Sequence, residues 1–353
     1  MVNELETLLT AYGIDSSSSL IEVISSGLIN PTWKITSDQD QFILQRINTS
    51  IFREPAKLAE NTRRLSDYVS KKFPEYLFVA PIPANDGNEL VNHNDQVYRL
   101  YPFVKNSHTI QSVSTVDQAY KAAVQFGKFT SVFSGFNRSQ LQSTIPNFHN
   151  LTFRHQQFRA AVRNGNQQRV AACSKEIQEI ESCSYLVDQY DSILKSPSFK
   201  LRVTHHDTKI SNVLFDPNDK GICVIDLDTV MPGYFISDVG DMMRTYLSPA
   251  NEEETDFSKI VVRADFYKAI AQGYLENMKT ELSKDEMEMF YFSGLMMTYM
   301  QAIRFLGDYL TDDNYYLTHH EAHNLVRAQN QLYLFSRLLK EQTSLSKIIS
   351  GHV

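Results

Sequence analysis

The stretch "VTHHDTKISNVLFD", from Val203 to Asp216, holds more acidic, basic and amide side chains than a turn between strands requires. Eight positions after Asp216 begins "VIDLDTV", Val224 to Val230, in which Asp226 and Asp228 follow an apolar run. An ordinary turn needs only residues such as Gly, Asn or Pro. The surplus of polar residues therefore indicates chemistry rather than folding alone.

Phosphoryl transfer gives a physical reason for this pattern. A hydroxyl that attacks a nucleotide γ-phosphate needs a proton acceptor, divalent cations on the phosphate oxygens, and a positive group for developing charge. Asp207 suits the first role, Asn212 and Asp226 are hard oxygen ligands for magnesium, and Lys209 is a mobile point charge. The order is also that of a kinase catalytic loop followed by a metal loop: Lys two residues and Asn five residues after the Asp, then a hairpin and Ile-Asp.

Composition narrows the class of protein. With 353 residues, 42% of them hydrophobic and 21% charged, the chain is typical of a globular protein with two domains or two lobes. Its net charge of −7 argues against a nucleic-acid partner, because such partners require a basic surface. We expect a cytoplasmic protein with no membrane partner, since no run approaches the ~20 apolar residues that span a bilayer. Nothing in the sequence indicates the oligomeric state.

The pattern changes near residue 104. Residues 1–104 are predicted to form an N-lobe with a small antiparallel sheet and a helix. The evidence is three strand-like runs, a helical pattern over Glu54–Phe73 and a strand pattern over Gln96–Val104. Residues 105–353 show helical periodicity around the polar loop, which predicts a mainly helical C-lobe. The helices are expected near residues 114–134, 148–163, 167–195, 257–279, 284–310 and 320–339, with a capping box at Ser283 and Glu286.

"THHDTKISNVLFD", "VIDLDTVMPG" and "DVGDMMRT" resemble the aminoglycoside phosphotransferase and choline kinase superfamily. Within it, "SGLINPTWKI", "FILQRINTSIFREPAKLAENTRRL" and "RFLGDYLTDDNYY" look like bacterial N-acetylhexosamine 1-kinases. The resemblance covers roughly residues 21–334. It implies an α+β, bilobal protein-kinase-like fold, ATP and Mg²⁺ as cofactors, and transfer of the γ-phosphate to the anomeric hydroxyl of a sugar such as GlcNAc or GalNAc.

The resemblance also assigns roles in the polar loop. Asp207 would be the catalytic base with Lys209 beside it, and His205 would brace the loop. Asn212 and Asp226 would bind magnesium, and Asp228 would assist a second metal ion. Asp238 would tie the helix that follows to the catalytic loop.

For the nucleotide, the resemblance implies contacts with Ser26 and Gly27 in the phosphate-covering turn and with backbone groups from Pro102 to Val104. Gln45 stands where protein kinases carry the lysine that clamps the phosphates. Either this neutral residue binds phosphate or the register differs, and Arg46 would point to the opposite face. Glu60 would then lack its usual cationic partner.

For the acceptor, the resemblance suggests Tyr246, Arg304 and Tyr315. Arg304 also follows the apolar run "FSGLMMTYMQAI", and a guanidinium on a largely buried helix usually has an acidic partner or a ligand.

Other functions remain open. The acceptor could be choline, homoserine, a thiosugar or an aminoglycoside, although an arginine near the acceptor disfavours cationic aminoglycosides. From a different class, "DLD" fits the DxD motif of a metal-dependent glycosyltransferase, but that function leaves Asp207, Lys209 and Asn212 unexplained. A nucleotide-binding pseudokinase is supported only by the missing clamp lysine.

Overall fold

The computed structural model describes residues 2–24, 29–37 and 40–351, which divide into two compact units. The first unit comprises Met1–His108, Gly135–Pro146 and Leu214–Pro232, and the second comprises Thr109–Ser134, Asn147–Val213 and Gly233–Val353. The first unit thus extends past the expected boundary at residue 104 and includes two later segments. One of these carries Asp226 and Asp228.

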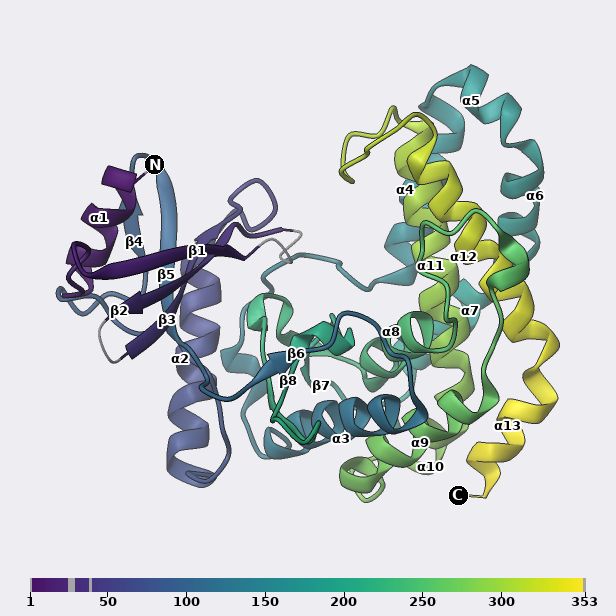
Figure 1. The fold of residues 1–353 in the computed structure, drawn as a ribbon. Coiled ribbons are helices and arrows are strands. Elements are labelled where there is room, and N and C mark those ends of the chain that lie inside the picture. The colour runs from purple at the N-terminus through teal and green to yellow at the C-terminus, as the bar shows by residue number, and fades with distance from the viewer. Residues whose placement is uncertain (1, 25–28, 38–39, 352–353) are drawn as a thin grey trace. The chain divides into compact units, whose positions relative to one another are not determined.

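An antiparallel sheet organises the first unit (Figure 1). Its five strands lie in the order β1-β2-β3-β5-β4, so the three strand-like runs of the sequence form the expected meander. The strands are β1 (Ser19–Ile24), β2 (Thr32–Ser37), β3 (Asp40–Ile47), β4 (Val91–His93) and β5 (Gln96–Pro102).

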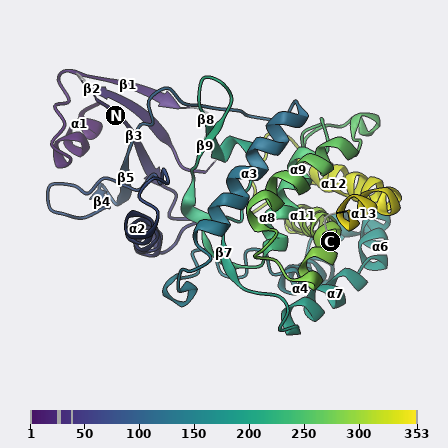
Figure 2. The same cartoon turned by 90° about the horizontal axis from the view of Figure 1, so that it is seen from below.

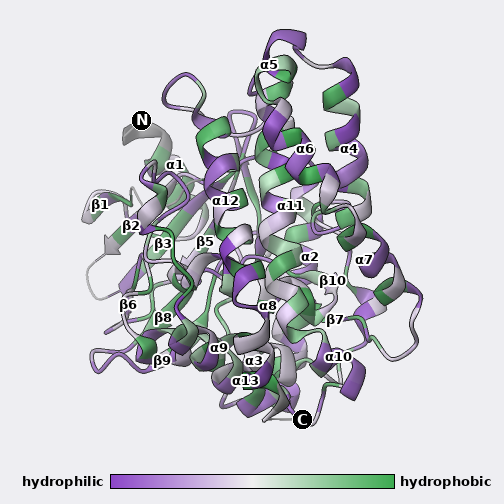
Figure 3. Ribbon diagram, turned by 90° about the vertical axis from the view of Figure 1, so that its right-hand side faces the viewer, coloured by the Kyte–Doolittle hydropathy of each residue, from purple (hydrophilic) through white to green (hydrophobic). Residues whose placement is uncertain are grey.

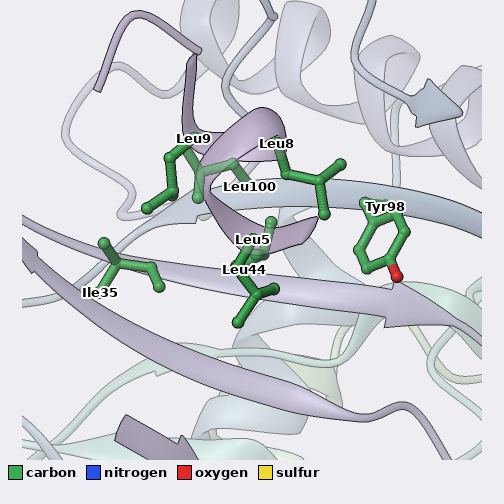
Figure 4. Close-up of a cluster of buried hydrophobic side chains, with 7 residues drawn as sticks. All are labelled: Leu5, Leu8, Leu9, Ile35, Leu44, Tyr98 and Leu100. Carbon is green, nitrogen blue, oxygen red and sulfur yellow. The ribbon is translucent and has the colours of Figure 1, made fainter. Parts of the chain in front are cut away.

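Helix α1 (Val2–Ala11) covers apolar residues of this sheet and is an element that the sequence analysis did not predict. Its leucines Leu5, Leu8 and Leu9 recur at helical spacing and are buried. Figure 4 shows them packed against Ile35, Leu44, Tyr98 and Leu100 of β2, β3 and β5. The amphipathic spacing was the available signal for this helix.

Helix α2 (Pro55–Lys72) matches the predicted helix, with Pro55 in its first turn as expected. The hairpin β8 (Val213–Phe215) and β9 (Gly221–Val224) follows the polar loop and leads into the turn η3 (Leu227–Thr229). Three of the sequence boundaries between the two units fall inside short strands. These strands are β8, β6 (His108–Thr109) and β10 (Met231–Gly233).

The second unit is mainly helical, so the expected α+β architecture of a small antiparallel-sheet unit and a larger helical unit is confirmed. Besides the strand β7 (Arg202–Thr204), its main elements are the helices α3 (Val116–Val132), α4 (Leu151–Asn164), α5 (Gln167–Ala172), α6 (Ser174–Ser182), α7 (Tyr185–Lys195), α8 (Phe235–Tyr246), α9 (Ala264–Met278), α10 (Lys284–Glu288), α11 (Phe290–Leu310), α12 (His323–Lys340) and α13 (Gln342–Ser350).

Two expected helices are interrupted. Residues 167–195 form three helices, because the chain turns at Cys173 and again near Cys183. The helix expected over 284–310 breaks at Met289 into α10 and α11. The predicted capping box at Ser283 is confirmed. Its partner Glu286 is fully buried, and an ion pair with Arg202 at 2.5 Å compensates the buried charge. Helical periodicity alone could not locate these breaks.

Close helix contacts hold the second unit together. Figures 1 and 2 show α3 and α9 side by side, and Gly127 of α3 and Gly273 of α9 each face the backbone of the other helix. Colouring by hydropathy shows hydrophobic and hydrophilic residues alternating along α4, as on a helix with one buried face (Figure 3). Among the described helices, none combines the length and apolar character that crossing a membrane requires.

Candidate active site

The polar loop of the second unit brings Asp207, Lys209 and Asn212 together. Lys209 Nζ lies 3.2 Å from Asp207 Oδ1, and Asn212 Nδ2 donates to Asp207 Oδ2 at 3.0 Å and to the Asp207 carbonyl at 2.9 Å. A short turn, η2 (Ile210–Asn212), creates this geometry by folding the amide back onto the carboxylate. Asp207 keeps 24% of its side chain exposed, so the carboxylate remains accessible.

The two histidines before Asp207 are buried. His205 lies edge-on to Phe126 and Phe129 of α3, and its Nδ1 accepts the Asp207 backbone N–H at 3.3 Å. These are contacts of a bracing residue. His206 adopts a left-handed backbone conformation with φ of 65°, which is rare for a residue with a side chain. Gly233 makes room for it, because a Cβ there would lie 2.4 Å from His206 Nε2.

Helix α8 holds the loop by its backbone, as predicted for Asp238. The two carboxylate oxygens of Asp238 accept the N–H groups of His205 and His206 at 2.9 and 2.8 Å. One turn further, Asp241 accepts the Thr208 N–H at 2.8 Å. The i, i+3 spacing places both acids on one face of the helix, so three backbone N–H groups of the loop are bound from one side.

Burial dominates the electrostatics of these two acids. It raises the pKa of Asp238 to about 7, against the lowering effect of the two backbone N–H groups. Burial also raises the pKa of Asp241, while Arg244, which donates to its Oδ1 at 2.9 and 3.1 Å, opposes the shift.

Tyr246, expected at the acceptor, is fully buried at the end of α8. Its hydroxyl donates to the Thr208 carbonyl at 2.6 Å, and burial raises its pKa well above the usual value. These contacts give Tyr246 a role in supporting the loop, and its contact with an acceptor stays a prediction.

The first unit carries the two acids of "DLD". Asp226 follows β9 and has a left-handed backbone with φ of 60°, a conformation that Asp tolerates better than most residues. Asp228 is 3% exposed, and both its oxygens are used: Arg99 donates to them at 2.5 and 2.7 Å and Asn30 Nδ2 donates at 2.8 Å. Its predicted role at a second metal ion stays a prediction, while its contacts are those of an ion-pair partner.

Arg99 supplies a positive charge beside Gln45. The two residues lie directly opposite on β5 and β3, and Arg99 donates to Gln45 Oε1 through Nε at 3.0 Å and Nη2 at 2.5 Å. Burial by itself lowers the pKa of Arg99, but Asp228 and, more weakly, Asp226 outweigh it and raise that pKa. The cation absent from the Gln45 position is therefore present on the neighbouring strand.

Other nucleotide candidates have local partners. Glu60 of α2 pairs with Arg64 and accepts from Gln142, so its cationic partner comes from its own helix. The Val104 carbonyl accepts from Ser107 Oγ at 2.6 Å, and Pro102 ends β5 opposite Phe42. Ser26 and Gly27 lie outside the described residues.

A pocket of about 440 Å³ opens between α4 and α11 of the second unit. It contains both remaining acceptor candidates, Arg304 and Tyr315, together with Arg154. The Arg304 guanidinium lies over the rings of Phe148 and Tyr316, 5.2 and 5.5 Å from their centroids. Phe148 in turn lies 6.4 Å, centroid to centroid, from the ring of His206. One aromatic ring thus links the pocket to the residue before Asp207.

Sequence reasoning missed Arg99, Asp241 and Arg154. Weak signals existed for the first two: a charge inside the apolar run "VYRLY", and an acid three residues after Asp238 in "SDVGD". Arg154 lies in a helix with several charged residues, and only the pocket distinguishes it.

Comparison with known proteins identifies the family. Residues 20–282 match the model of the phosphotransferase enzyme family, which covers most of the chain and includes the polar loop and α8. The chain therefore belongs to this family, the phosphotransferases related to aminoglycoside phosphotransferases and choline kinases.

Solved structures share the fold at low sequence identity. A microcompartment-associated aminopropanol kinase is 15% identical with a TM-score of 0.64, over 98% of this chain and 99% of that one. Choline kinase from Cryptosporidium parvum is 14% identical with a TM-score of 0.58, over 100% and 98% of the two chains. A spectinomycin phosphotransferase in complex with ADP and spectinomycin is 15% identical with a TM-score of 0.55, over 99% and 98%.

Proposed function

We propose that this protein transfers the γ-phosphate of ATP, with Mg²⁺, to the anomeric hydroxyl of an N-acetylhexosamine such as GlcNAc or GalNAc. Family membership supports phosphoryl transfer. The observation that carries the choice of acceptor is the pocket between α4 and α11, which combines two arginines with aromatic rings.

The charge of this pocket disfavours cationic acceptors. The related structures include kinases named for aminopropanol and choline, which carry positive charge at neutral pH. Arg154 and Arg304 would repel such a group. Among the described residues that line the pocket, the one acid is Asp308, which already accepts the N–H groups of Tyr315 and Tyr316 at 2.8 and 2.9 Å. Sugars suit aromatic surfaces and multiple N–H donors.

The loop geometry supports the following catalytic step. Asp207 accepts the proton of the attacking hydroxyl as its oxygen bonds to the γ-phosphorus and the bond to the bridging oxygen of ADP breaks. Lys209, held 3.2 Å from Asp207, compensates charge on the transferred group. His205 and Asp238 keep the loop in place through the backbone.

The residues present fit a magnesium ion. Asn212 uses its Nδ2 for Asp207, and among the described residues no donor engages its Oδ1, the hard oxygen that magnesium prefers. Asn212 and Asp226 would hold the ion, which when bound neutralises charge on the phosphate oxygens. We assign Asp228 to holding Arg99 beside Gln45, because both its oxygens are engaged.

An ADP-release assay with a panel of acceptors tests this function. We expect turnover with GlcNAc or GalNAc and little with choline, ethanolamine, homoserine or spectinomycin. The methyl glycoside of GlcNAc is the matched control, since only its anomeric oxygen is blocked, and it should give no ADP. Faster turnover of an amine, or turnover of the methyl glycoside, would contradict the anomeric hydroxyl of an N-acetylhexosamine as the acceptor.

A further inference from the structure

Among the described residues, neither of the two arginines of the α4–α11 pocket pairs with an acid. Arg154 donates to the Phe148 carbonyl at 3.1 Å and to Gln157 Oε1 at 2.9 Å. Arg304 donates to Gln301 Oε1 at 3.1 Å. Five other arginines of the unit pair with carboxylates: Arg159, Arg169, Arg202, Arg244 and Arg327.

Both guanidinium groups retain unused donors. An arginine carries five N–H groups, and among the described residues none accepts from Nη2 of Arg154 or from Nε and Nη2 of Arg304. The two charges also repel each other. The pKa of Arg154 is lowered to about 10, first by burial and then by the positive charge of Arg304. A nearby anion would relieve this repulsion.

Among the described residues that line the pocket, the acid is already engaged by other donors. Asp308 lines the pocket, but its oxygens accept from the backbone of Tyr315 and Tyr316 and from Asn324 at 3.0 Å. These bonds also fix the turn that carries Tyr315, a pocket residue that remains 54% exposed. The pocket therefore presents two cations and the partly exposed Tyr315, whose ring lies 6.0 Å from the Arg304 guanidinium and edge-on to Tyr316.

We propose that this pocket is an oxyanion subsite, in which Arg154 and Arg304 bind a phosphate or carboxylate carried by a hexose and Tyr315 contacts the sugar ring. The planar guanidinium matches both oxyanions, and two of them can bind one group. A hexosamine phosphate then competes with a neutral hexosamine for the pocket. This competition rests on the proposed function, whereas the binding itself does not.

Calorimetry on the full chain without nucleotide tests the binding. The probes are GlcNAc, GlcNAc 6-phosphate, glucuronate and inorganic phosphate. We expect GlcNAc 6-phosphate to bind at least about tenfold more tightly than GlcNAc, since hydrogen bonds to a charged group add to the neutral contacts. The advantage should shrink with added salt. Binding of glucuronate shows whether a carboxylate suffices. Binding of inorganic phosphate, compared with GlcNAc 6-phosphate, shows whether the sugar contributes.

Variants on one helix provide the control. Arg154→Gln should remove the advantage of the phosphorylated sugar, while Arg159→Gln, also on α4 but outside the pocket, should retain it. Equal affinity for the neutral and acidic sugars, or an unchanged preference in Arg154→Gln, overturns the subsite. If Arg154→Gln unfolds, salt dependence in the wild type still decides.

The outcome is separable from the proposed function. If acidic sugars bind through Arg154 but GlcNAc gives no ADP release, the subsite holds and the acceptor assignment fails. If GlcNAc is phosphorylated while GlcNAc 6-phosphate neither binds more tightly nor inhibits, the acceptor assignment holds and the subsite fails.

Discussion

Asp207 differs from the other acids around the loop in what surrounds it. Its oxygens contact the side chains of Lys209 and Asn212 and remain accessible, whereas Asp238 and Asp241 are buried and bind backbone N–H groups. An accessible carboxylate next to a cation suits proton acceptance from a substrate hydroxyl. Buried carboxylates on backbone donors suit positioning instead.

Replacing Asp207 by Asn should therefore affect turnover more than stability. We expect Asp207→Asn to lower turnover at least ~100-fold, the scale of a lost acid–base contribution, because the amide still accepts from Asn212 but takes no proton. The unfolding midpoint should change little. Asp188→Asn, an exposed acid on α7, is the control and should keep full turnover. Near wild-type turnover in Asp207→Asn would contradict the assigned role.

Asp238 should make stability depend on pH. Its native pKa, raised to about 7 by burial, lies above that of the unfolded chain, so between about pH 4 and 7 the native state holds a proton that unfolding releases. Relative to Asp238→Asn, which does not titrate, wild-type stability should fall by about 1.4 kcal/mol per pH unit across this range and level off above pH 7. Denaturant unfolding of both proteins from pH 5 to 8 measures the difference, and a constant difference would refute the raised pKa.

At the scale of elements, glycines set the distance between helices. A Cβ on Gly127 would lie 2.6 Å from the Tyr274 carbonyl oxygen, and one on Gly273 would lie 2.4 Å from that of Tyr120. Both neighbours are backbone atoms, which cannot move away as a flexible side chain can. The contact between α3 and α9 therefore requires glycine on each helix.

Substitution of either glycine by Ala should push α3 and α9 apart. We expect Gly127→Ala and Gly273→Ala each to destabilise the protein by about 1–3 kcal/mol, the usual range for overpacking. Gly307→Ala in α11 is the control: its nearest atom would be Phe158 Cα at 3.8 Å, an ordinary contact, and the higher helix propensity of Ala should stabilise it by up to ~1 kcal/mol. Thermal unfolding compares the three, and equal effects would remove the steric explanation.

Element prediction succeeded where signals were local. The meander, α2 with its proline and the capping box at Ser283 follow from residues close in sequence. The interruptions at Cys173, Cys183 and Met289 carry no glycine or proline, so periodicity predicted longer helices than the structure has.

At the scale of the whole molecule, the predicted catalytic and metal residues belong to different units. Asp207, Lys209 and Asn212 lie in the second unit, and Asp226 lies in the first. In the function proposed above, all four act on one nucleotide. Because the proposed roles of base and metal ligand differ, we expect variants of Asp207 and Asp226 to affect different steps of one reaction.

Magnesium dependence separates those steps. We expect Asp226→Asn to raise the magnesium concentration needed for half-maximal activity and to weaken stabilisation by a non-hydrolysable ATP analogue, since the amide lacks the ligand charge but tolerates the left-handed backbone. Asp207→Asn should retain that stabilisation at each magnesium concentration. Thermal shifts over a magnesium series provide the measurement. Identical behaviour of both variants would argue against separate roles as ligand and base.

The sequence by itself determined that Asp207, Lys209 and Asn212 lie close together in one loop, because they fall within six consecutive residues and their order constrains their geometry. It also determined the fold class, since strand and helix periodicities are local. Only the tertiary structure decided the rest: Arg99 meets Asp228 across 129 positions in the chain, and Arg154 shares a pocket with Arg304. Such partners follow from packing between distant elements, which no spacing in the sequence records.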